Sequence, residues 1–421
     1  MKKHTYRSLR GMPDILPEEA AAFRMVEEKS REVFRIYEFS EIRTPILEET
    51  GVFIRSIGEN TDIVEKEMYS LKSRSGKDIS LRPEGTASII RAFIENKMYA
   101  GGETLKLFYM GPMFRSERPQ KGRLRQFHQI GAEIIGISGQ DIAQDIELIT
   151  NAKAILEGIG VDNAELNINS LGCAEDRKEY KKILKKYLVE KKDGLCENCR
   201  ARISSNVLRV LDCKSKTCKE IIKNAPKVTD SLCGKCSAHY DGIKNNLKTL
   251  DVSFKENHNL VRGLDYYTGI VFEINHPSLG AQDAIAAGGR YDNLTEDMGG
   301  PDVGAIGYAI GVERALLAVG EDKKPRLSKG TLVIALGDAS LPDALKTVST
   351  LRKRNIACEI IQAKKSLKSA MRKANKENRN NVILIGEEEV EKKVVLLKDM
   401  KTGEQESLTI GEVIERLRGE K

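Results

Sequence analysis

The stretch from Gly111 to Glu133 reads GPMFRSERPQKGRLRQFHQIGAE and decides the fold, because it predicts a β-hairpin with one chemically active face. Side chains alternate between the two faces of a strand, so every second residue of the second strand points the same way. The segment from Ser116 to Gly122, with charged residues, a proline and a closing glycine, predicts a long connection between the strands. One face of the second strand therefore carries Arg125, Phe127, Gln129, Gly131 and Glu133, and the other carries Gln126, His128, Ile130 and Ala132.

The residue types on the first face are those of a nucleotide pocket. Arg115, at the end of the first strand, can reach the same space. A guanidinium matches phosphate oxygens with two parallel hydrogen bonds, and the flat ring of Phe127 can lie against a base. Gly131 leaves room beside Gln129 and Glu133. The other interpretation is an amphipathic hairpin whose arginines are solvated or paired with carboxylates.

Length and composition indicate a globular protein of two or three domains, because 421 residues provide ample chain for a core. Hydrophobic residues make up 40% and charged residues 31%, and no apolar run approaches the roughly 20 residues of a transmembrane helix. The N-terminal segment is positively charged but lacks the apolar stretch of a secretory signal, so we expect a cytoplasmic protein without a membrane partner. The net charge of +7 is compatible with a nucleic-acid partner but does not require one.

Two segments precede the hairpin. Residues Pro17 to Tyr37 have apolar side chains at helical spacing, and the following SEIRTPILEE predicts a short strand that reaches Pro45. ISLRPEGTA, which ends at Ala87, predicts a strand that breaks before a helix opening at Thr86. Glu84 and Thr86 at this turn can accept hydrogen bonds from a substrate ammonium group, although the same residues also suit the capping of the helix.

Three segments follow in the second half of the chain. VRGLDYYTGIVFEI brings Arg262 beside the phenol groups of Tyr266 and Tyr267, and AIAAGGRYDNL contains the glycine pair 288–289, which either lies close to a ligand or marks a bend. GAIGYAIGVERALLAV predicts a strand and then a helix that begins near Val312. Arg314 in the first turn of that helix opposes the helix dipole, so it calls for an anionic partner, either a terminal phosphate or a carboxylate such as Glu313.

Six cysteines lie between residues 196 and 236. Disulfides are not expected in a cytoplasmic protein, and two Cys-x-x-Cys pairs can form a tetrahedral thiolate site for Zn²⁺ in a ribbon-like fold. The alternatives are reduced thiols without metal, or a site in which Cys213 or Cys218 replaces one pair. The ligands predicted for this possible zinc ion are Cys196, Cys199, Cys233 and Cys236.

From about Gly330 the sequence alternates between apolar strand patterns and helical patterns, which predicts a compact α/β domain. The charged stretch before it, residues 323–329, suits a linker. A basic stripe in this domain could meet a phosphate backbone, although lysines on a helix are usually only a solvated face. The stripe consists of Lys364, Lys365, Lys368, Arg372 and Lys373.

Taken together, these segments resemble the class II aminoacyl-tRNA synthetases in their histidyl form. Residues 111–133 resemble motif 2, the helix, strand and proline of residues 17–45 resemble motif 1, and residues 304–319 resemble motif 3. RGLDYY and GGRYDN look like the two histidine-specific signatures and are the most specific matches. The resemblance covers essentially the whole chain, and it is weakest from residue 172 to about 253.

The resemblance implies an α+β catalytic domain built on an antiparallel sheet, an insertion domain, and a C-terminal α/β anticodon-binding domain. The implied boundaries are 1–171 and 254–322 for the two parts of the catalytic core, 172–253 for the insertion with the cysteine cluster, and 330–421 for the anticodon-binding domain. The family's insertion commonly lacks such a cluster, so the resemblance supports the insertion and leaves the metal undecided.

The resemblance also implies activation of L-histidine by ATP with Mg²⁺, then transfer of histidine to tRNA(His), by a homodimer that assembles through motif 1. The implied catalytic residues are Arg115 and Arg262, the implied ATP-binding residues are these two with Arg123, Phe127 and Arg314, and the candidates for the tRNA acceptor end are Arg118 and Gln120. The implied histidine-binding residues are Glu84, Thr86, Gln129, Glu133, Tyr266 and Tyr267, of which Glu133 and Tyr267 would pair with opposite edges of the imidazole ring.

Three other functions compete with this one. A non-catalytic relative that partners ATP phosphoribosyltransferase in histidine biosynthesis lacks the anticodon-binding domain, whereas this chain has the pattern of one. Synthetases of the same subclass for glycine, proline or threonine would share the three motifs but not RGLDYY. A purely structural RNA-binding protein would leave the phosphate-facing arginines without a role.

Overall fold

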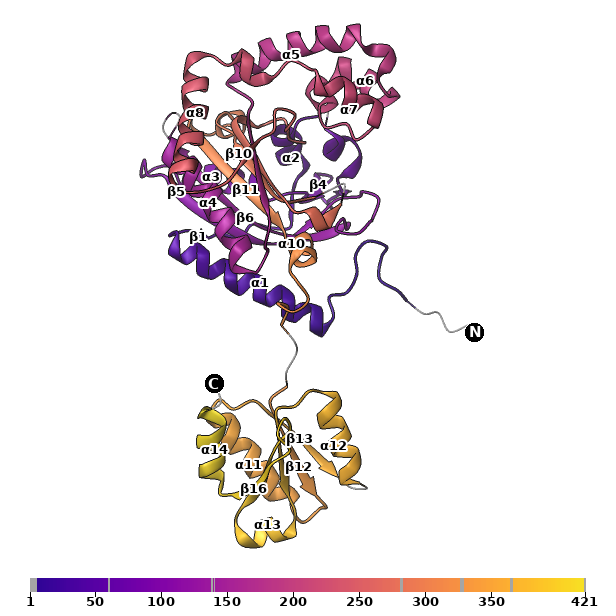
Figure 1. Ribbon diagram of the computed structural model, residues 1–421, viewed down its shortest axis with the longest axis vertical. Helices are drawn as coiled ribbons and strands as arrows, with labels where there is room; N and C mark the ends of the chain where they lie inside the picture. Colours follow the sequence, from indigo (N-terminus) through magenta and orange to yellow (C-terminus); the bar gives the residue numbers. More distant parts are fainter. Residues whose placement is uncertain are drawn as a thin grey trace. The chain divides into compact units, whose positions relative to one another are not determined.

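The computed structural model describes residues 6–59, 61–137, 139, 141–280, 283–325, 329–363 and 366–419. These residues form two compact units, Met1–Lys324 and Pro325–Lys421, each with its own sheet (Figure 1). The division falls within the predicted linker, of which residues 326–328 lie outside the described part. In the described residues, no helix is both long enough and apolar enough to cross a bilayer.

An eight-stranded sheet forms the centre of the first unit. Its six inner strands are antiparallel to their neighbours, and a short parallel strand lies at each edge. The predicted antiparallel sheet is thereby confirmed. In spatial order the strands are β1 (Ser40–Glu41), β5 (Leu105–Phe114), β6 (Gln126–Ile137), β11 (Gly304–Gly311), β10 (Ala284–Arg290), β9 (Thr268–Asn275), β7 (Glu165–Ser170) and β8 (Lys255–Glu256).

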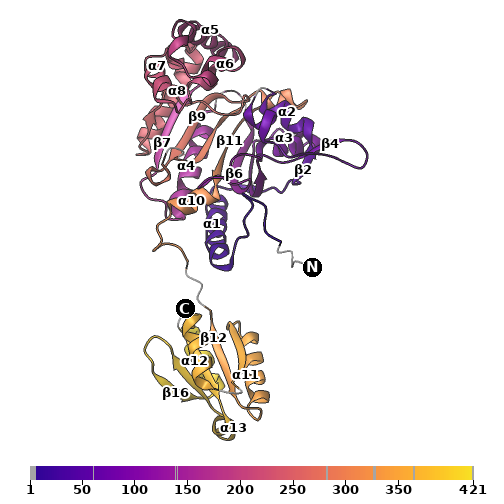
Figure 2. The same cartoon turned by 90° about the vertical axis from the view of Figure 1, so that its right-hand side faces the viewer.

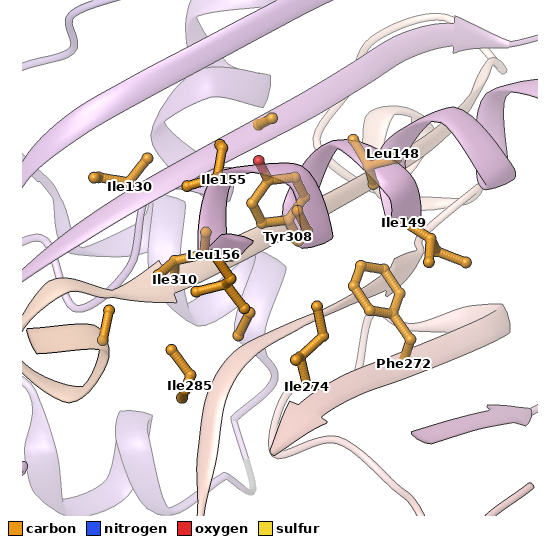
Figure 3. Packing of buried hydrophobic residues seen from close by; sticks show 14 of the residues in the cluster. Ile130, Leu148, Ile149, Ile155, Leu156, Phe272, Ile274, Ile285, Tyr308 and Ile310 are labelled. Carbon is orange, nitrogen blue, oxygen red and sulfur yellow. The ribbon is translucent and has the colours of Figure 1, made fainter. Parts of the chain in front are cut away.

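Helices α1 (Pro17–Ile36), α4 (Ile142–Gly158) and α8 (Gly234–Thr249) cover one face of this sheet with their buried side chains. Figure 3 shows Ile155 and Leu156 of α4 beside Tyr308 and Ile310 of β11, all in one apolar cluster. Each fully buried aliphatic side chain of this kind contributes about 1.5–3 kcal/mol. The cluster therefore gives the sheet a rigid backing.

The opposite face of the sheet is only partly covered. Helix α3 (Thr86–Glu95) covers the C-terminal end of β6, where Ile135 belongs to the same buried cluster as Ile89 and Phe93. The N-terminal end of β6 is left open for a cavity. The remaining elements around this face are α2 (Thr50–Ile57), the π-helical turn η1 (Ile63–Glu67), α9 (Leu294–Asp297) and a three-stranded sheet of β2 (Leu47–Glu49), β4 (Asp78–Leu81) and β3 (Ser70–Lys72). Helix α10 (Val312–Ala318) directly follows β11, and its buried side chains belong to the cluster with α1 and α4.

The predicted hairpin is β5 with β6, paired so that Met113 lies opposite Phe127. Ile130 and Ala132 are in the cluster with α1 and α4, so the assignment of the two faces is confirmed. The segment SEIRTPILEE differs from the prediction, because it forms two short strands, β1 and β2, that belong to different sheets. The first strand ends at Glu41, and Pro45, which has no N–H to offer to a ladder, lies in the connection between the two strands.

The glycine pair has a packing role rather than a ligand role. A Cβ on Gly288 would come within 2.4 Å of the carbonyl oxygen of Gly307, and one on Gly289 within 2.6 Å of that of Ile270. Both glycines therefore allow β10 to lie close to its neighbouring strands. Neither lines the cavity described below.

Arg290, which follows this pair, is the hub of a buried charge network. Its side chain is fully buried and donates to the carboxylates of Asp145 at 2.7 Å and Asp292 at 2.8 Å, and to the carbonyl of Gly139 at 2.9 Å. Asp145 is fully buried as well. A buried charge that loses its partner is costly.

We therefore expect Arg290→Met to lower the free energy of unfolding of the first unit by about 3–5 kcal/mol, because it removes the guanidinium beside the buried Asp145 carboxylate and leaves it, among the described residues, only the ring of His239, at 2.7 Å. The measurement is urea unfolding followed by circular dichroism. The control is Lys72→Met, which removes an ion pair with Asp78 between two largely exposed side chains and should change stability little. Equal effects of the two variants would refute the role of the network.

Residues 172–253 are helical rather than ribbon-like. They form α5 (Ala174–Glu190), α6 (Glu197–Ser205), α7 (Lys216–Lys223) and α8, with 3₁₀ turns between them. Leu184, Ile203 and Ile222 are buried in a separate core that includes two of the cysteines. Figure 2 shows α5, α6 and α7 close together, on the side of the sheet where β7 and β9 lie. The apolar residues between the cysteines stabilise helices, which the cysteine spacing alone did not indicate.

The second unit has a five-stranded sheet with helices on both faces, as predicted for a compact α/β domain. The strands in order are β13 (Cys358–Ala363), β12 (Thr331–Leu336), β14 (Asn381–Ile385), β15 (Val395–Asp399) and β16 (Gln405–Leu408), and the helices are α11 (Leu341–Lys353), α12 (Leu367–Lys376), α13 (Glu387–Lys392) and α14 (Ile410–Gly419). Of the basic stripe, Lys368 and Arg372 are exposed and Lys373 pairs with Glu359. Lys364 and Lys365 lie outside the described residues.

Candidate active site

A cavity of about 920 Å³ opens over the uncovered end of β6. Its wall comes from β5, β6, β9, β10, β11, the turn before α3, and residues 209–223 of the insertion. The structure brings together every predicted histidine-binding and ATP-binding residue except Glu133 on this wall. The predicted residues that line it are Glu84, Thr86, Arg115, Arg123, Phe127, Gln129, Arg262, Tyr266, Tyr267 and Arg314.

Glu84 caps α3. Its two carboxylate oxygens accept hydrogen bonds from the backbone N–H groups of Thr86 at 2.7 Å and Ala87 at 2.8 Å, and burial raises its pKa. Both interpretations of this turn are compatible, because a carboxylate has about four acceptor positions and only two are used. A ligand ammonium group can still bind to Glu84.

Glu133 lies behind the cavity wall. Its carboxyl group is fully buried and accepts hydrogen bonds from the hydroxyls of Thr86, at 2.7 Å, and Tyr291. Burial raises the pKa of Glu133 to about 8. A Cβ on Gly307 would come within 1.5 Å of this carboxyl, so the glycine is what makes room for it. These two hydrogen bonds leave acceptor positions on the carboxyl group, but Glu133 does not itself line the cavity wall.

Three buried polar atoms on the wall have no hydrogen-bond partner among the described residues: the hydroxyl of Tyr109, Oε1 of Gln129 and Nε of Arg262. Buried polar atoms are costly unless they are hydrogen-bonded. A polar ligand in the cavity would supply the missing partners. The site thus has the character of a binding site rather than of a solvated surface.

Tyr109 is a residue that sequence reasoning missed. It faces Gly131 across the hairpin, and its ring occupies the space above Gly131 and Gly85, where a Cβ would come within 2.4 Å and 2.3 Å. In the sequence, Gly131 indicated that a large side chain packs against this position of the strand. Identifying that neighbour required the register of the hairpin, which its long connection does not fix.

Two arginines face the cavity without a carboxylate within 4 Å in the described part of the chain. The guanidinium of Arg115 lies 5.2 Å from the centre of the Phe127 ring, and its Nε donates to the carbonyl of Pro83. Arg314 donates to the carbonyls of Gly122 and Ala284, each at 2.9 Å. Burial, with the nearby charge of Arg123, lowers the pKa of Arg314. An anion at this end of the cavity would compensate both charges.

The other two predicted arginines are ion-paired. Arg262 donates to Glu273 at 3.0 Å, and Arg123 donates to Glu117 at 2.9 Å. Glu273 was also missed from the sequence, and it orients Arg262 from the neighbouring strand.

The carboxylate considered as a partner for Arg314 bonds elsewhere. Glu313 accepts from the backbone N–H of His128 and pairs with its ring Nδ1 at 2.9 Å. A phosphate remains the partner that fits Arg314.

Arg118 and Gln120 do not line the cavity. They are exposed on the connection between β5 and β6, which is held in place by a backbone bridge between Gln120 and Arg123. Their contact with the tRNA acceptor end stays a prediction.

The cysteines form two separate groups, so the two Cys-x-x-Cys pairs do not meet, contrary to the prediction. The first group contains the sulfur atoms of Cys196, Cys199, Cys213 and Cys218, and the second contains Cys173, Cys233 and Cys236 with the carboxylate of Asp176. The pairs are kept apart because they begin different helices, α6 and α8. The alternative named Cys213 or Cys218 as the replacement for one pair, and the structure brings both of them to Cys196 and Cys199.

In the described residues, both groups of candidate metal ligands lie in the insertion, and they consist of cysteines and Asp176. No such group lies among the carboxylates of the cavity in the described part of the chain. Mg²⁺ is usually held by substrate phosphates together with few protein ligands. A Mg²⁺ ion in this cavity would therefore arrive with a polyphosphate.

Comparison with known proteins agrees with the geometry. Residues 11–315 match the family model described as histidyl-tRNA synthetase, and residues 331–420 match an anticodon binding domain. The chain is 46% identical to the histidine–tRNA ligase of Thermosipho melanesiensis over 95% of both chains. It is 46% identical to that of Thermodesulfovibrio yellowstonii over 98% of both, and 45% identical to that of Aquifex aeolicus over 97% of this chain and 99% of the relative.

Solved structures give the same result. The apo histidyl-tRNA synthetase of S. aureus superimposes with a TM-score of 0.80 at 33% identity, covering 98% of this chain and all of the other. A Bacillus halodurans protein described as an ATP phosphoribosyltransferase regulatory subunit/histidyl-tRNA synthetase matches with a TM-score of 0.65 at 20% identity, which indicates a shared fold only. On the family model, the full-length relatives and the superposition, this chain belongs to the histidyl-tRNA synthetase family.

Proposed function

We propose that the protein activates L-histidine with ATP and Mg²⁺ to histidyl-adenylate and pyrophosphate, and then transfers histidine to the 3′ end of tRNA(His). The observation that carries this function is the wall of one cavity, which contains three unpartnered polar atoms and two uncompensated arginines. Histidine and ATP bound together would supply partners for the polar atoms and anionic groups for the arginines.

The arginines would act in the first step. The histidine carboxylate attacks the α-phosphorus of ATP, the bond to the β-phosphate oxygen breaks, and pyrophosphate leaves with its electron pair. Arg115 and Arg262 stabilise the charge that develops on the α-phosphate, and Arg314 holds the terminal phosphates. The Phe127 ring, which already lies against Arg115, provides a flat surface for the adenine.

Histidine selection would occur at the other end of the cavity. Glu84, Thr86 and Gln129 take the ammonium group, and Tyr266, Tyr267 and Glu133 surround the imidazole. Because these polar groups are buried, a side chain that leaves them unpaired is rejected by roughly 10⁴-fold or more. Glu133 has the greatest influence on selection, since its carboxyl group is fully buried and an imidazole N–H that it accepts would be a charge-assisted donor.

The second step would use the exposed connection between β5 and β6. Arg118 and Gln120 lie on this segment and are available to the acceptor end of tRNA(His). We assign the remaining tRNA contact to the C-terminal unit as a whole. A regulatory, non-catalytic role is less well supported, because the chain contains both the second unit and the complete set of cavity arginines.

The experiment that tests this function is amino-acid-dependent exchange of pyrophosphate into ATP, with each of the twenty amino acids offered separately in the presence of Mg²⁺. We expect exchange with histidine alone. Exchange with a different amino acid would place the protein elsewhere in class II, and no exchange would favour a regulatory subunit.

We also propose that the protein is a cytoplasmic homodimer with domain boundaries at residues 171, 253 and 322. Support for the dimer comes from large apolar side chains left exposed near motif 1. Leu16 and Ile36 at the ends of α1 are 65% and 61% exposed, and Leu47 of β2 is 44% exposed. We expect sedimentation to give a dimer, and a stable, active monomer would contradict this proposal.

A further inference from the structure

Four cysteines of the insertion converge on one point although they come from three places in the chain: the start of α6, residue 213 and the first turn of α7. The sulfur atoms of Cys196, Cys199, Cys213 and Cys218 all lie within 4.8 Å of one another, and those of Cys196 and Cys213 are 3.8 Å apart. All four are free thiols. A disulfide requires sulfur atoms about 2.05 Å apart, so this spacing is not that of a disulfide pair.

The spacing agrees with a tetrahedral metal site. Zinc binds thiolate sulfur at about 2.3 Å, and the edges of a tetrahedron with that radius are about 3.8 Å long. Four thiolates with this geometry are the usual ligand set of a structural zinc site. The group includes two buried members, Cys199 and Cys218, within the apolar core of the insertion.

The beginnings of two helices lie around the group. Cys196 is the N-cap of α6 and Cys199 lies in its first turn, where the helix dipole stabilises negative charge. Cys218 lies in the first turn of α7, and its sulfur accepts a hydrogen bond from the backbone N–H of Cys196 at 3.2 Å. These contacts connect the beginnings of the two helices around the four sulfur atoms.

The second group of cysteines has a different purpose. The carboxylate of Asp176 already accepts hydrogen bonds from the backbone N–H groups of Cys173, at 3.3 Å, and Cys233, at 2.9 Å. It thereby caps α5 and ties the beginning of α8 to it. Cys233 is exposed. This group is a helix-capping arrangement and serves as an internal control for the first.

We propose that Cys196, Cys199, Cys213 and Cys218 bind one zinc ion, which ties the insertion to the rim of the active-site cavity. The segment between the second and third ligands contains Arg209, which donates to Asp62 of the catalytic core at 2.7 Å. The segment around the third and fourth ligands contributes Lys214 and Lys219 to the cavity wall. The metal cross-links these segments, so it holds a positively charged rim in place.

The test measures zinc in the full-length chain, purified with zinc present and dialysed against a weak chelator. We expect one zinc ion per chain in the wild type, loss of zinc in Cys213→Ser, and one zinc ion in Cys233→Ser. In Cys213→Ser, amide hydrogens of residues 207–223 should exchange faster, while those of α4 should be unchanged.

A wild-type chain without zinc, two zinc ions per chain, or equal loss of zinc in Cys213→Ser and Cys233→Ser would overturn the proposal. If Cys213→Ser does not fold, the wild-type chain loaded with Co²⁺ replaces it, and the expected result is the visible spectrum of tetrahedral thiolate coordination. An octahedral spectrum would overturn the proposal. None of these results depends on the ligase activity.

Discussion

Arg115→Gln lowers kcat for histidine-dependent pyrophosphate exchange by about 10²–10³-fold, the loss expected when one preorganised donor to a developing charge is removed. Arg115 faces the cavity, and its guanidinium has no carboxylate within 4 Å in the described part of the chain. Removing its charge therefore leaves no unpaired anion behind, and the loss reports on the reaction rather than on folding. The same substitution at Arg262 would leave Glu273 without its partner and would be harder to interpret.

The control for this result is Arg91→Gln. Arg91 is a partly exposed arginine of α3 that pairs with Glu48 and does not line the cavity. We expect this variant to retain the exchange activity of the wild type. Similar losses in the two variants, or an Arg115→Gln enzyme with a raised KM for ATP and a normal kcat, would show that Arg115 does not stabilise the transition state.

Glu133→Gln raises the KM for histidine by about 10- to 150-fold, which corresponds to one hydrogen bond to a charged group of about 1.5–3 kcal/mol. The amide is similar in shape to the carboxyl group but carries no charge, so a hydrogen bond that its oxygen accepts from the imidazole N–H is not charge-assisted. Its oxygen can still accept from Thr86, so the fold should be kept. Exchange kinetics with histidine varied measure this effect. An unchanged KM would remove Glu133 from the histidine site.

The same variant tests the pKa of Glu133. In the unfolded chain this carboxyl group loses its proton near its ordinary pKa of 4.5, whereas burial raises the folded-state pKa to about 8. Between these values the unfolded chain binds fewer protons, so raising the pH favours unfolding. The stabilising contribution is complete below pH 4.5 and is lost as the pH rises through about 8.

We therefore expect the stability of the wild type to fall relative to Glu133→Gln between about pH 5 and pH 8. Urea unfolding of both proteins across this range gives the difference. Glu190→Gln is the control, because Glu190 is exposed at the end of α5 and should give no such trend. A constant difference between wild type and Glu133→Gln would mean that the carboxyl group titrates normally.

Sequence reasoning succeeded where a local pattern determines the structure. Alternation predicted which residues of β6 face the core and which face the cavity, and Ile130 and Ala132 are buried as expected. The helix that opens at Thr86 and the helix that begins at Val312 were also predicted, because a strand with glycine at or near its end precedes each of them.

It failed where the structure depends on contacts between distant parts of the chain. Tyr291, which bonds to Glu133 and holds it behind the wall, is 158 residues away from it. The register that places Tyr109 over Gly131, and the grouping of Cys213 with Cys196, likewise follow from tertiary packing. Spacing in the sequence shows which residues are capable of a role, but not which of them meet.

The capping of α3 by Glu84 makes the start of a core helix part of the amino-acid site. The two backbone N–H groups that hold Glu84 share its carboxylate with any ammonium ion that binds there. Coupling between two interactions is reciprocal. If the ligand weakens these two hydrogen bonds, the hydrogen bonds weaken the binding of the ligand, and if it strengthens them, they strengthen its binding. The amide protons in the first turn of α3 therefore report whether the amino-acid site is occupied.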